Sequence, residues 1–212
     1  MHIADGVLPA SVPIAGTAAA AVGVGYGLAR TDYERLPRVA VLASAFYVAS
    51  LIHQPVGPTS VHLVLNGLVG LLLGWAAMPA LLVGLLLQAL MFGYGGLTVL
   101  GVNTVNMALP AVACYYLFGP GVRSSRRSVA FAGGFAAAVT AIVLSAALTS
   151  AVLVAAGQAY HTVAAAVFLA NLPVAVVEGL VTANVVVFLK KVRPELLHAP
   201  ILEPCAVEAA GA

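Results

Sequence analysis

The sequence predicts an all-α integral membrane protein: a bundle of about seven transmembrane helices with the N-terminus outside and the C-terminus in the cytoplasm. Of the 212 residues, 62% are hydrophobic and 8% are charged, whereas a soluble domain has about 45–50% apolar and about 25% charged residues. The apolar residues form continuous runs close to the roughly 20 residues that cross a bilayer as a helix. They do not alternate with polar residues, as they do in the strands of a membrane barrel.

The positions of the apolar runs give the individual spans. These are expected at residues 11–29, 38–53, 61–77, 80–97, 104–118, 129–156 and 163–189. The second and fifth runs are short and Pro79 and Pro110 lie near boundaries, so six spans with one re-entrant segment is the alternative. Residues 1–193 then form one transmembrane domain that begins with a metal-binding segment at 1–10. The polar, proline-containing tail at 194–212 is expected to be disordered in the cytoplasm.

The basic residues predict the orientation. They form three clusters, after the first span (Arg30, Arg35, Arg38), between the fifth and sixth spans (Arg123, Arg126, Arg127) and after the seventh span (Lys190, Lys191, Arg193). With seven spans, all nine lie on one side, which the positive-inside rule makes cytoplasmic. No basic stretch or small-residue cleavage pattern typical of a signal peptide precedes the first span. We therefore expect a multi-pass membrane protein that starts at Met1.

Composition and motifs exclude several classes of function. With so few charges the chain is not expected to be a soluble enzyme, a nucleic-acid binder or a secreted disulfide scaffold. Cys114 and Cys205 are far apart and match no metal-binding or redox spacing. The only lysines, Lys190 and Lys191, are not part of a G-x-x-x-x-G-K-[ST] phosphate loop. Any ATP-driven transport would therefore need separate ATPase subunits.

Histidines gather on the predicted outer side. Four of the five lie in or beside external segments: His2, His53, His62 and His161. Polar residues in or near a membrane are functional candidates because leaving them unpaired is costly. A spacing of four residues places Asn66, Gly70 and Gly74 on the same predicted helix face as His62. We interpret His62 and Asn66 as functional candidates, and the two glycines as a site of close helix packing.

Two further polar groups stand out. Residues 93–106 are rich in glycine and asparagine, and Asn103 and Asn106 in this segment face the same outer side in the predicted topology. Glu178 is the single acidic residue inside a predicted span. The sequence leaves open whether Glu178 is a proton or ion site or a structural partner of a neighbouring helix.

The first two residues form a potential metal chelate. The Met1 α-amine, the His2 amide nitrogen and the His2 imidazole Nδ1 can close adjacent chelate rings around one ion. One more imidazole completes a planar set of four nitrogens, which suits Ni(II), Cu(II) or Co(II), whereas zinc prefers a tetrahedral shell. The bulky His2 side chain also disfavours enzymatic removal of Met1. His62 lies on the same predicted side of the membrane.

Three segments carry a family resemblance. MHIADGVLP at the start, PTSVHLVLNGLVGLLLG at 58–74 and GGLTVLGVNTVNMALP at 95–110 resemble the cobalt/nickel-specific substrate-binding (S) components of energy-coupling factor (ECF) transporters, the CbiM/NikM type. The resemblance covers most of residues 1–118, and the later spans match in hydropathy. The family pattern Ser-x-Ser-His-Pro-Thr-Gly is replaced here by Thr-Ser-Val-His-Leu-Val-Leu-Asn-Gly.

The resemblance implies a seven-helix protein that captures Co(II) or Ni(II) outside the cell for ATP-driven uptake, supplying cobalamin synthesis or nickel enzymes. It implies Met1, His2 and His62 as metal ligands. The residues expected around them, or on the route by which the ion enters, are Asp5, His53, Ser60, Asn66, Asn103 and Asn106. The implied partners are a transmembrane coupling (T) protein, cytoplasmic ATPase subunits and, as a further candidate, a small accessory membrane subunit. The metal is the transported substrate, and no other cofactor is expected.

Two other classes of function remain as alternatives. An intramembrane metalloenzyme would need a motif such as H-E-x-x-H, but no two histidines are four residues apart, so we expect no enzyme. A self-powered secondary carrier would place ionisable residues at the membrane midplane and show internal repeats, and this chain offers Glu178 alone. The sequence does not separate cobalt from nickel; neighbouring genes for cobalamin synthesis or for nickel enzymes would.

Overall fold

The computed structural model describes residues 2–56 and 59–198 of the chain. Its elements in order are α1 (Ser11–Ala29), η1 (Tyr33–Arg35), α2 (Leu36–Ala49), β1 (His53–Val56), β2 (Thr59–His62), α3 (Asn66–Leu73), η2 (Gly74–Ala76), α4 (Ala77–Phe92), α5 (Leu100–Arg123), α6 (Arg127–Ala156), η3 (Gln158–Tyr160), α7 (His161–Val192) and α8 (Glu195–His198). Five stretches are long and apolar enough to cross a membrane: Ser11–Ala29, Asn66–Phe92, Leu100–Arg123, Arg127–Ala156 and Gln158–Val192. The predicted class of helical membrane protein is confirmed, while the exact number of crossings stays a prediction.

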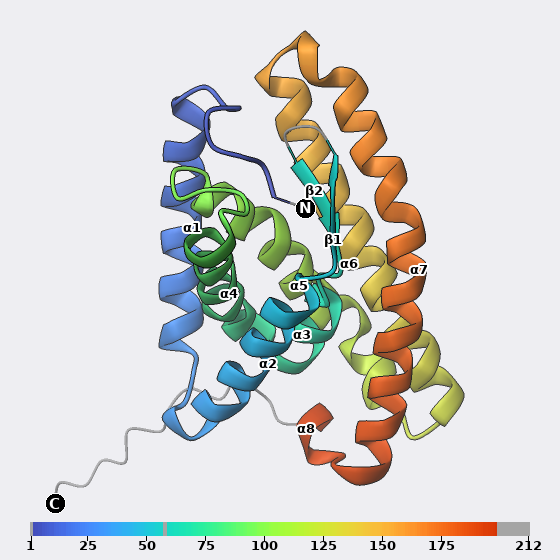
Figure 1. Cartoon of the computed structure of the whole chain (residues 1–212). Coiled ribbons are helices and arrows are strands. Elements are labelled where there is room, and N and C mark those ends of the chain that lie inside the picture. Colours follow the sequence, from blue (N-terminus) through green and yellow to red (C-terminus); the bar gives the residue numbers. More distant parts are fainter. Residues whose placement is uncertain (1, 57–58, 199–212) are drawn as a thin grey trace, which may run out of the picture.

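The helices are arranged around α5. This helix packs against α1, α3, α4 and α6, and α6 pairs along its length with α7. Figure 1 shows α6 and α7 as a long pair on one side of the molecule and α1 on the other. The largest side chains of the main core cluster include Phe46, Leu73, Leu81 and Met107 from the helices between these two sides, and Ile142 from α6. The core is therefore made of apolar contacts between helices.

Helix α3 is short, and all eight of its residues are buried. Gly70 allows α5 to approach, because a Cβ at this position would lie 2.1 Å from the carbonyl oxygen of Ala111. This contact confirms that Gly70 serves helix packing. Gly74 ends α3 with φ +55°, a conformation that glycine adopts without strain. After Gly74 the chain turns back, so that α3 runs alongside α5 and α4 alongside α1.

The predicted span at 61–77 is wrong in its first part, and so is the all-α description. Residues 53–56 and 59–62 form an antiparallel hairpin in which His53 is paired with His62. The helix begins only at Asn66, and the spans predicted at 38–53 and 80–97 end earlier, at Ala49 and Phe92. His62 therefore does not share a helix face with Asn66. The physical reason is local: β-branched residues around the hairpin favour extended backbone, and Pro55 lacks the N–H that a helix requires.

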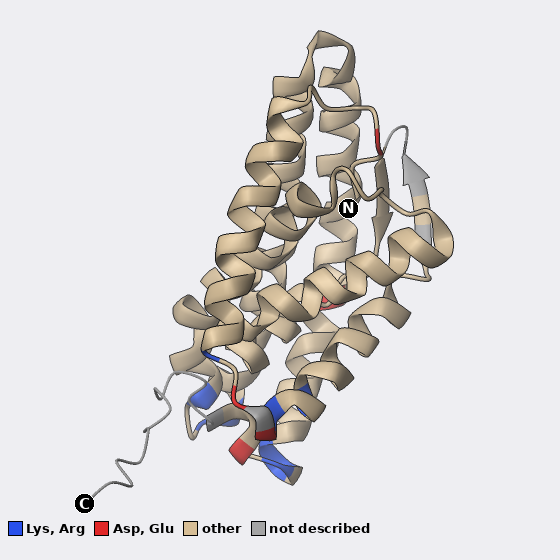
Figure 2. Cartoon of the chain, turned by 90° about the vertical axis from the view of Figure 1, so that its left-hand side faces the viewer, with Lys and Arg blue, Asp and Glu red and all other residues tan. Residues whose placement is uncertain are grey.

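The two ends of the bundle differ in charge. Figure 2 shows the Lys and Arg residues gathered at one end, opposite the end at which α1 begins. Between the ends, large apolar side chains point outward, including Ile14, Val22, Leu117 and Leu169. An apolar surface of this extent on a soluble protein would mark a binding site or cause aggregation, but it suits contact with lipid. The clustering agrees with the predicted orientation, which stays a prediction.

Order extends slightly beyond residue 193, where the disordered tail was predicted to begin. Residues 195–198 form α8, and Leu197 is buried. The Arg38 guanidinium donates to the carbonyl oxygen of Leu196, and Arg123 donates to that of Leu197 at 3.1 Å. These hydrogen bonds pair the backbone carbonyls of Leu196 and Leu197 with side chains. Residues 195–198 are therefore helical, whereas 194–198 were predicted to belong to a disordered tail. The rest of the predicted tail, 199–212, lies outside the described residues.

Candidate metal site

The N-terminal segment folds back into the bundle. From the start of α1 it runs inward, and its first described residues lie beside β2 (Figure 1). His2 and Ile3 are buried, with 2% and 0% of their surface exposed. Ile3 also forms an isolated antiparallel bridge with Thr59 of β2. The segment is therefore aligned with the hairpin that carries His62.

The two candidate imidazoles lie side by side. The rings of His2 and His62 stack with centroids 4.5 Å apart and an angle of 14° between their planes, and His62 is 2% exposed. The ring of Tyr94 is 6.3 Å from that of His2. The structure thus brings together the two histidines that the sequence selected as ligands, although 60 positions separate them in the chain.

The protonation of His62 follows from its backbone contact. Its Nδ1 lies 2.8 Å from the carbonyl oxygen of Leu63. A carbonyl oxygen can only accept, so Nδ1 carries a proton, and in the neutral imidazole Nε2 then carries the lone pair. Histidines that bind metals commonly donate their other ring N–H to a carbonyl in this way, which orients the ring. A neutral His62 held in this way could bind a metal only through Nε2.

Asn103 holds the N-terminal segment in place. Its Oδ1 accepts a hydrogen bond from the Ile3 N–H at 2.9 Å, and its Nδ2 donates to the Ile3 carbonyl at 3.1 Å. The amide side chain thereby satisfies both backbone groups of a buried residue, as a neighbouring strand would. Asn103 was predicted near the site, and its position in the structure shows that it orients the residue next to His2.

Asp5 anchors the other end of this segment. Its carboxylate accepts hydrogen bonds from the Thr98 N–H at 3.2 Å and from the Thr98 hydroxyl, and its own N–H donates to the Gly95 carbonyl at 3.1 Å. Gly96 is required here, because a Cβ at this position would lie 2.0 Å from the carboxyl carbon of Asp5. Sequence analysis missed this role of the glycines, although the Gly-Tyr-Gly-Gly run indicated an unusual backbone.

The remaining predicted residues have different surroundings. Asn66 donates to the Met107 carbonyl at 3.0 Å and to the Ser145 hydroxyl at 2.9 Å, so it joins α3 to α5 and α6. Asn106 is buried, and its Nδ2 has no hydrogen-bond partner among the described residues. Ser60 lies opposite Pro55 in the hairpin, and His53 is the strand partner of His62. Met1 lies outside the described residues.

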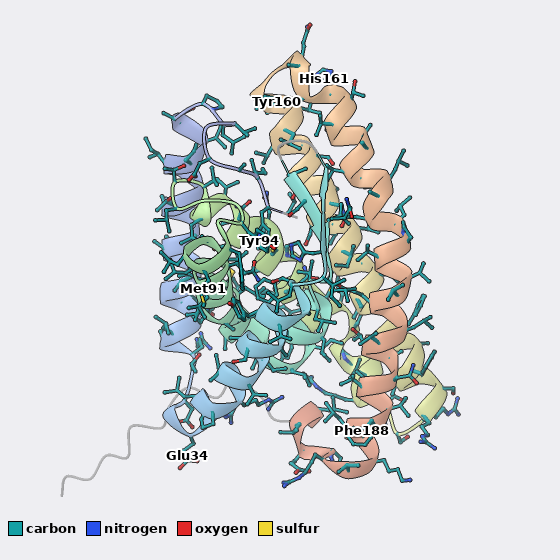
Figure 3. All side chains as sticks on the ribbon, viewed as in Figure 1. Glu34, Met91, Tyr94, Tyr160, His161 and Phe188 are labelled. Atoms are coloured by element: carbon teal, nitrogen blue, oxygen red, sulfur yellow. The ribbon has the colours of Figure 1, made fainter. Side chains whose placement is uncertain are left out.

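His161 is remote from this group. It begins α7, and Figure 3 shows it at the tip of the molecule beside Tyr160, far from Tyr94. Its side chain is exposed. The structure therefore supports the interpretation of His161 as an interfacial residue.

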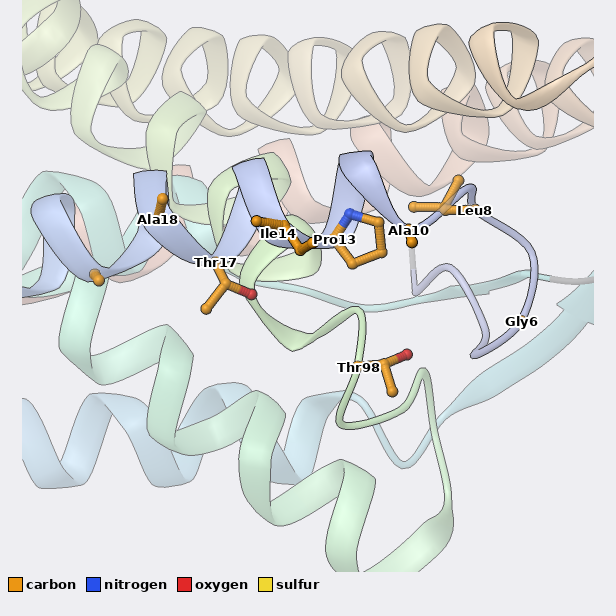
Figure 4. Close-up of a pocket in the computed structure, with 9 residues that line it drawn as sticks. Gly6, Leu8, Ala10, Pro13, Ile14, Thr17, Ala18 and Thr98 are labelled. Carbon is orange, nitrogen blue, oxygen red and sulfur yellow. The ribbon is translucent and has the colours of Figure 1, made fainter.

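A surface hollow lies elsewhere, beside α1. This open groove of about 790 Å³ runs along the outer face of α1 (Figure 4) and is lined by Gly6, Leu8, Ala10, Pro13, Ile14, Thr17, Ala18, Ala21 and Thr98. None of these side chains is a usual metal ligand. Within residues 2–56 and 59–198, no three His, Cys, Asp or Glu side chains lie close enough together to hold a metal ion. A metal at the stacked histidines would therefore need further ligands other than these side-chain types.

Comparison with known proteins identifies the family. The model of the CbiM family, described as the cobalt uptake substrate-specific transmembrane region, matches residues 2–196. The chain belongs to the CbiM family. The match extends the resemblance seen in the first half of the sequence to nearly the whole transmembrane domain.

Relatives of this CbiM-family chain are named as transport proteins. It is 40% identical to a putative metal transport protein of Haemophilus influenzae over 93% of this chain and 97% of that protein. It is 36% identical to the fused nickel transport protein NikMN of Rhodobacter capsulatus, over 98% of this chain and 67% of that protein. It is 33% identical to the cobalt transport protein CbiM of Sorangium cellulosum, over 93% of this chain and 94% of that protein.

The fold is also that of a solved structure. A crystal structure of a transition metal transporter superposes with a TM-score of 0.73 over 91% of this chain and 93% of that chain, at 24% sequence identity. The chain is thus a CbiM-type membrane protein of cobalt and nickel transport. Because its relatives are transport proteins, the prediction that it is not an enzyme is confirmed, and the metalloenzyme alternative is dropped.

Proposed function

We propose that this chain is the substrate-specific S component of an ECF-type transporter in the cell membrane of a prokaryote, which captures Co(II) or Ni(II) outside for ATP-driven uptake. Membership of the CbiM family supports this role. The chain contains no phosphate-binding loop, so the energy would come from ATPase subunits through a membrane coupling protein. The chain spans 67% of the fused Rhodobacter protein, whose additional part supports association with a further, accessory component.

The stacked pair of buried histidines is the observation that supports the metal site most directly. The proposed ligands are the Met1 α-amine, the His2 amide nitrogen and Nδ1, and the His62 Nε2. Parallel rings cannot both direct a ring nitrogen at one ion in their planes, so we expect one ring to rotate when the metal binds. The amine, amide and imidazoles must be deprotonated to bind the metal, so entry of the ion releases protons and acid weakens binding.

The surrounding residues have supporting roles in this proposal. Asp5 and Asn103 hold the N-terminal segment so that His2 meets His62. Ser60 in the hairpin, Asn66 in α3 and Asn106 in α5 are proposed to form the buried polar surroundings of the site. His53, paired with His62 through the backbone, is proposed to lie on the route by which the ion enters.

Uptake is expected to depend on partner subunits. Cells that make this chain with its coupling protein and ATPase should accumulate radioactive cobalt or nickel, whereas cells with an ATPase carrying a disabled phosphate loop should not. The physical reason is that the S component binds the ion but has no site for ATP. Equal uptake by cells that contain this chain alone would overturn the proposal in favour of a self-powered carrier.

The topology can be tested separately. A reporter fused to the C-terminus is expected to be active only in the cytoplasm, because all nine basic residues would then lie on the cytoplasmic side. The matched control is the same reporter inserted at Gly157, in the turn between α6 and α7 at the opposite end of the bundle. A reporter that is active outside the cell at the C-terminus would contradict the orientation.

A further inference from the structure

Glu178 connects α7 to the segment that follows His62. It lies within α7 and is fully buried. Its two carboxylate oxygens accept hydrogen bonds from consecutive backbone N–H groups, those of Val64 and Leu65, the latter at 2.9 Å. The one ion pair among the described residues joins Arg193 to Glu195. No described basic side chain therefore pairs with Glu178, and the backbone of residues 63–65 is its partner.

The segment 63–65 needs such a partner. It joins the strand that ends at His62 to the helix that begins at Asn66, and it has no regular structure of its own. Leu65 has φ +55° and is the only described residue other than glycine with a positive φ. A left-handed conformation of this kind is strained for a residue with a side chain and persists when the surrounding structure enforces it. Buried N–H groups also have to be paired, and a carboxylate pairs them strongly.

The same segment determines where His62 points. It contains Leu63, whose carbonyl oxygen accepts a hydrogen bond from the His62 Nδ1–H at 2.8 Å. Glu178 accepts hydrogen bonds from the backbone of Val64 and Leu65. The side-chain amide of Asn66, the next residue, attaches the chain to α5 and α6. A shift of the backbone at 64–65 would move the Leu63 carbonyl and rotate the His62 ring.

We propose that Glu178 is a positioning residue of the metal site, which sets the direction of the His62 Nε2 by clamping the N–H groups of Val64 and Leu65. This inference rests on the proposed function, because it assumes that His62 binds the metal. It assigns a role to the acidic residue of α7 for which the sequence left two interpretations open. Both carboxylate oxygens are engaged by backbone, so Glu178 acts on the ion through His62 and does not bind it.

The test uses the full-length chain with an unmodified N-terminus, in detergent, titrated with Ni(II). In Glu178→Gln, one oxygen still accepts a hydrogen bond, but the new amide NH₂ faces the second backbone N–H. We expect the dissociation constant for Ni(II) to rise about 10–100-fold, as for other groups that orient a metal-binding histidine. The visible absorption of bound Ni(II), which reports the ligand geometry, should change as well.

A matched control lies on the same helix. Asn171 is equally buried, and its amide donates within α7 to the Val167 carbonyl at 2.7 Å. Asn171→Leu should lower the melting temperature of the metal-free protein but leave Ni(II) affinity and the absorption spectrum unchanged. If Glu178→Gln does not fold, Glu178→Asp keeps the charge and both acceptor oxygens but withdraws them by one methylene group. We expect it to fold, to bind Ni(II) more weakly and to shift the spectrum.

The outcomes separate this proposal from the proposed function. If His62→Ala weakens binding and the Glu178 variants bind and absorb like the wild type, the role of Glu178 is refuted and the metal site stands. If His62→Ala also binds like the wild type, the metal site itself is refuted. A loss of affinity in Asn171→Leu as large as that in the Glu178 variants would show a general effect of α7 on stability and would overturn the positioning role.

Discussion

A single residue added ahead of Met1 is expected to abolish metal binding and uptake while the bundle stays folded. The addition converts the proposed α-amine ligand into an amide, which binds metal poorly, and it moves His2 to the third position. His2 and Ile3 are also almost completely buried, so the extra residue would have to enter the packed interior. Calorimetry with Ni(II) or Co(II) on the purified chain, together with uptake in cells, measures the effect.

The matched control is the same chain with a removable extension. Cleavage that restores Met1 as the first residue should restore binding, and an equally long addition at the C-terminus should have no effect. Mass spectrometry must show which N-terminus is present in each sample. Wild-type binding by the extended chain, with its extension verified, would refute the terminal amine as a ligand and leave His2 as an ordinary buried histidine.

His62→Ala is expected to have the second largest effect, because it removes one of four proposed ligands. Loss of a group that merely orients a metal-binding histidine costs about 10–100-fold in affinity, and loss of the ligand itself should exceed this range. His62 is buried against His2, whereas His161 is exposed at the tip of α7. His161→Ala should therefore bind Ni(II) like the wild type in the same calorimetric titration.

The comparison of the two variants decides which histidine belongs to the site. Equal losses at His62 and His161 would show that the wrong histidine was selected. A normal affinity in His62→Ala with a loss in His53→Ala would move the site to the other strand of the hairpin, since His53 is the backbone partner of His62.

Local patterns in the sequence were sufficient for the class of fold and for the choice of candidate ligands. Hydropathy over windows of about 20 residues indicates membrane helices, because every residue in such a helix contributes to its transfer into lipid. The close approach at Gly70 was also predicted correctly. A glycine in a helix has no side chain, so the backbone of a neighbouring helix can lie against it. His2 could be selected by the chelate chemistry of the N-terminus, and His62 by its predicted side of the membrane and the family resemblance.

The shape of the site depended on contacts that no local pattern contains. Ile3 meets Asn103 across 100 positions, and Leu65 meets Glu178 across 113. Of the residues in the two strands of the hairpin, His53, Val61 and His62 were predicted to lie inside helical spans, because hydropathy alone does not show where a span ends; the residues between them were predicted to lie outside the spans. The strands and the turn at Leu65 form where the N-terminal segment and α7 supply backbone and carboxylate partners.

The sequence by itself therefore determined the membrane-helix class, the basic end of the bundle and the candidate histidines. Only the tertiary structure decided that His2 stacks on His62 and that Asn103, Asp5 and Glu178 hold the segments that carry them, because those hydrogen bonds depend on how distant helices pack.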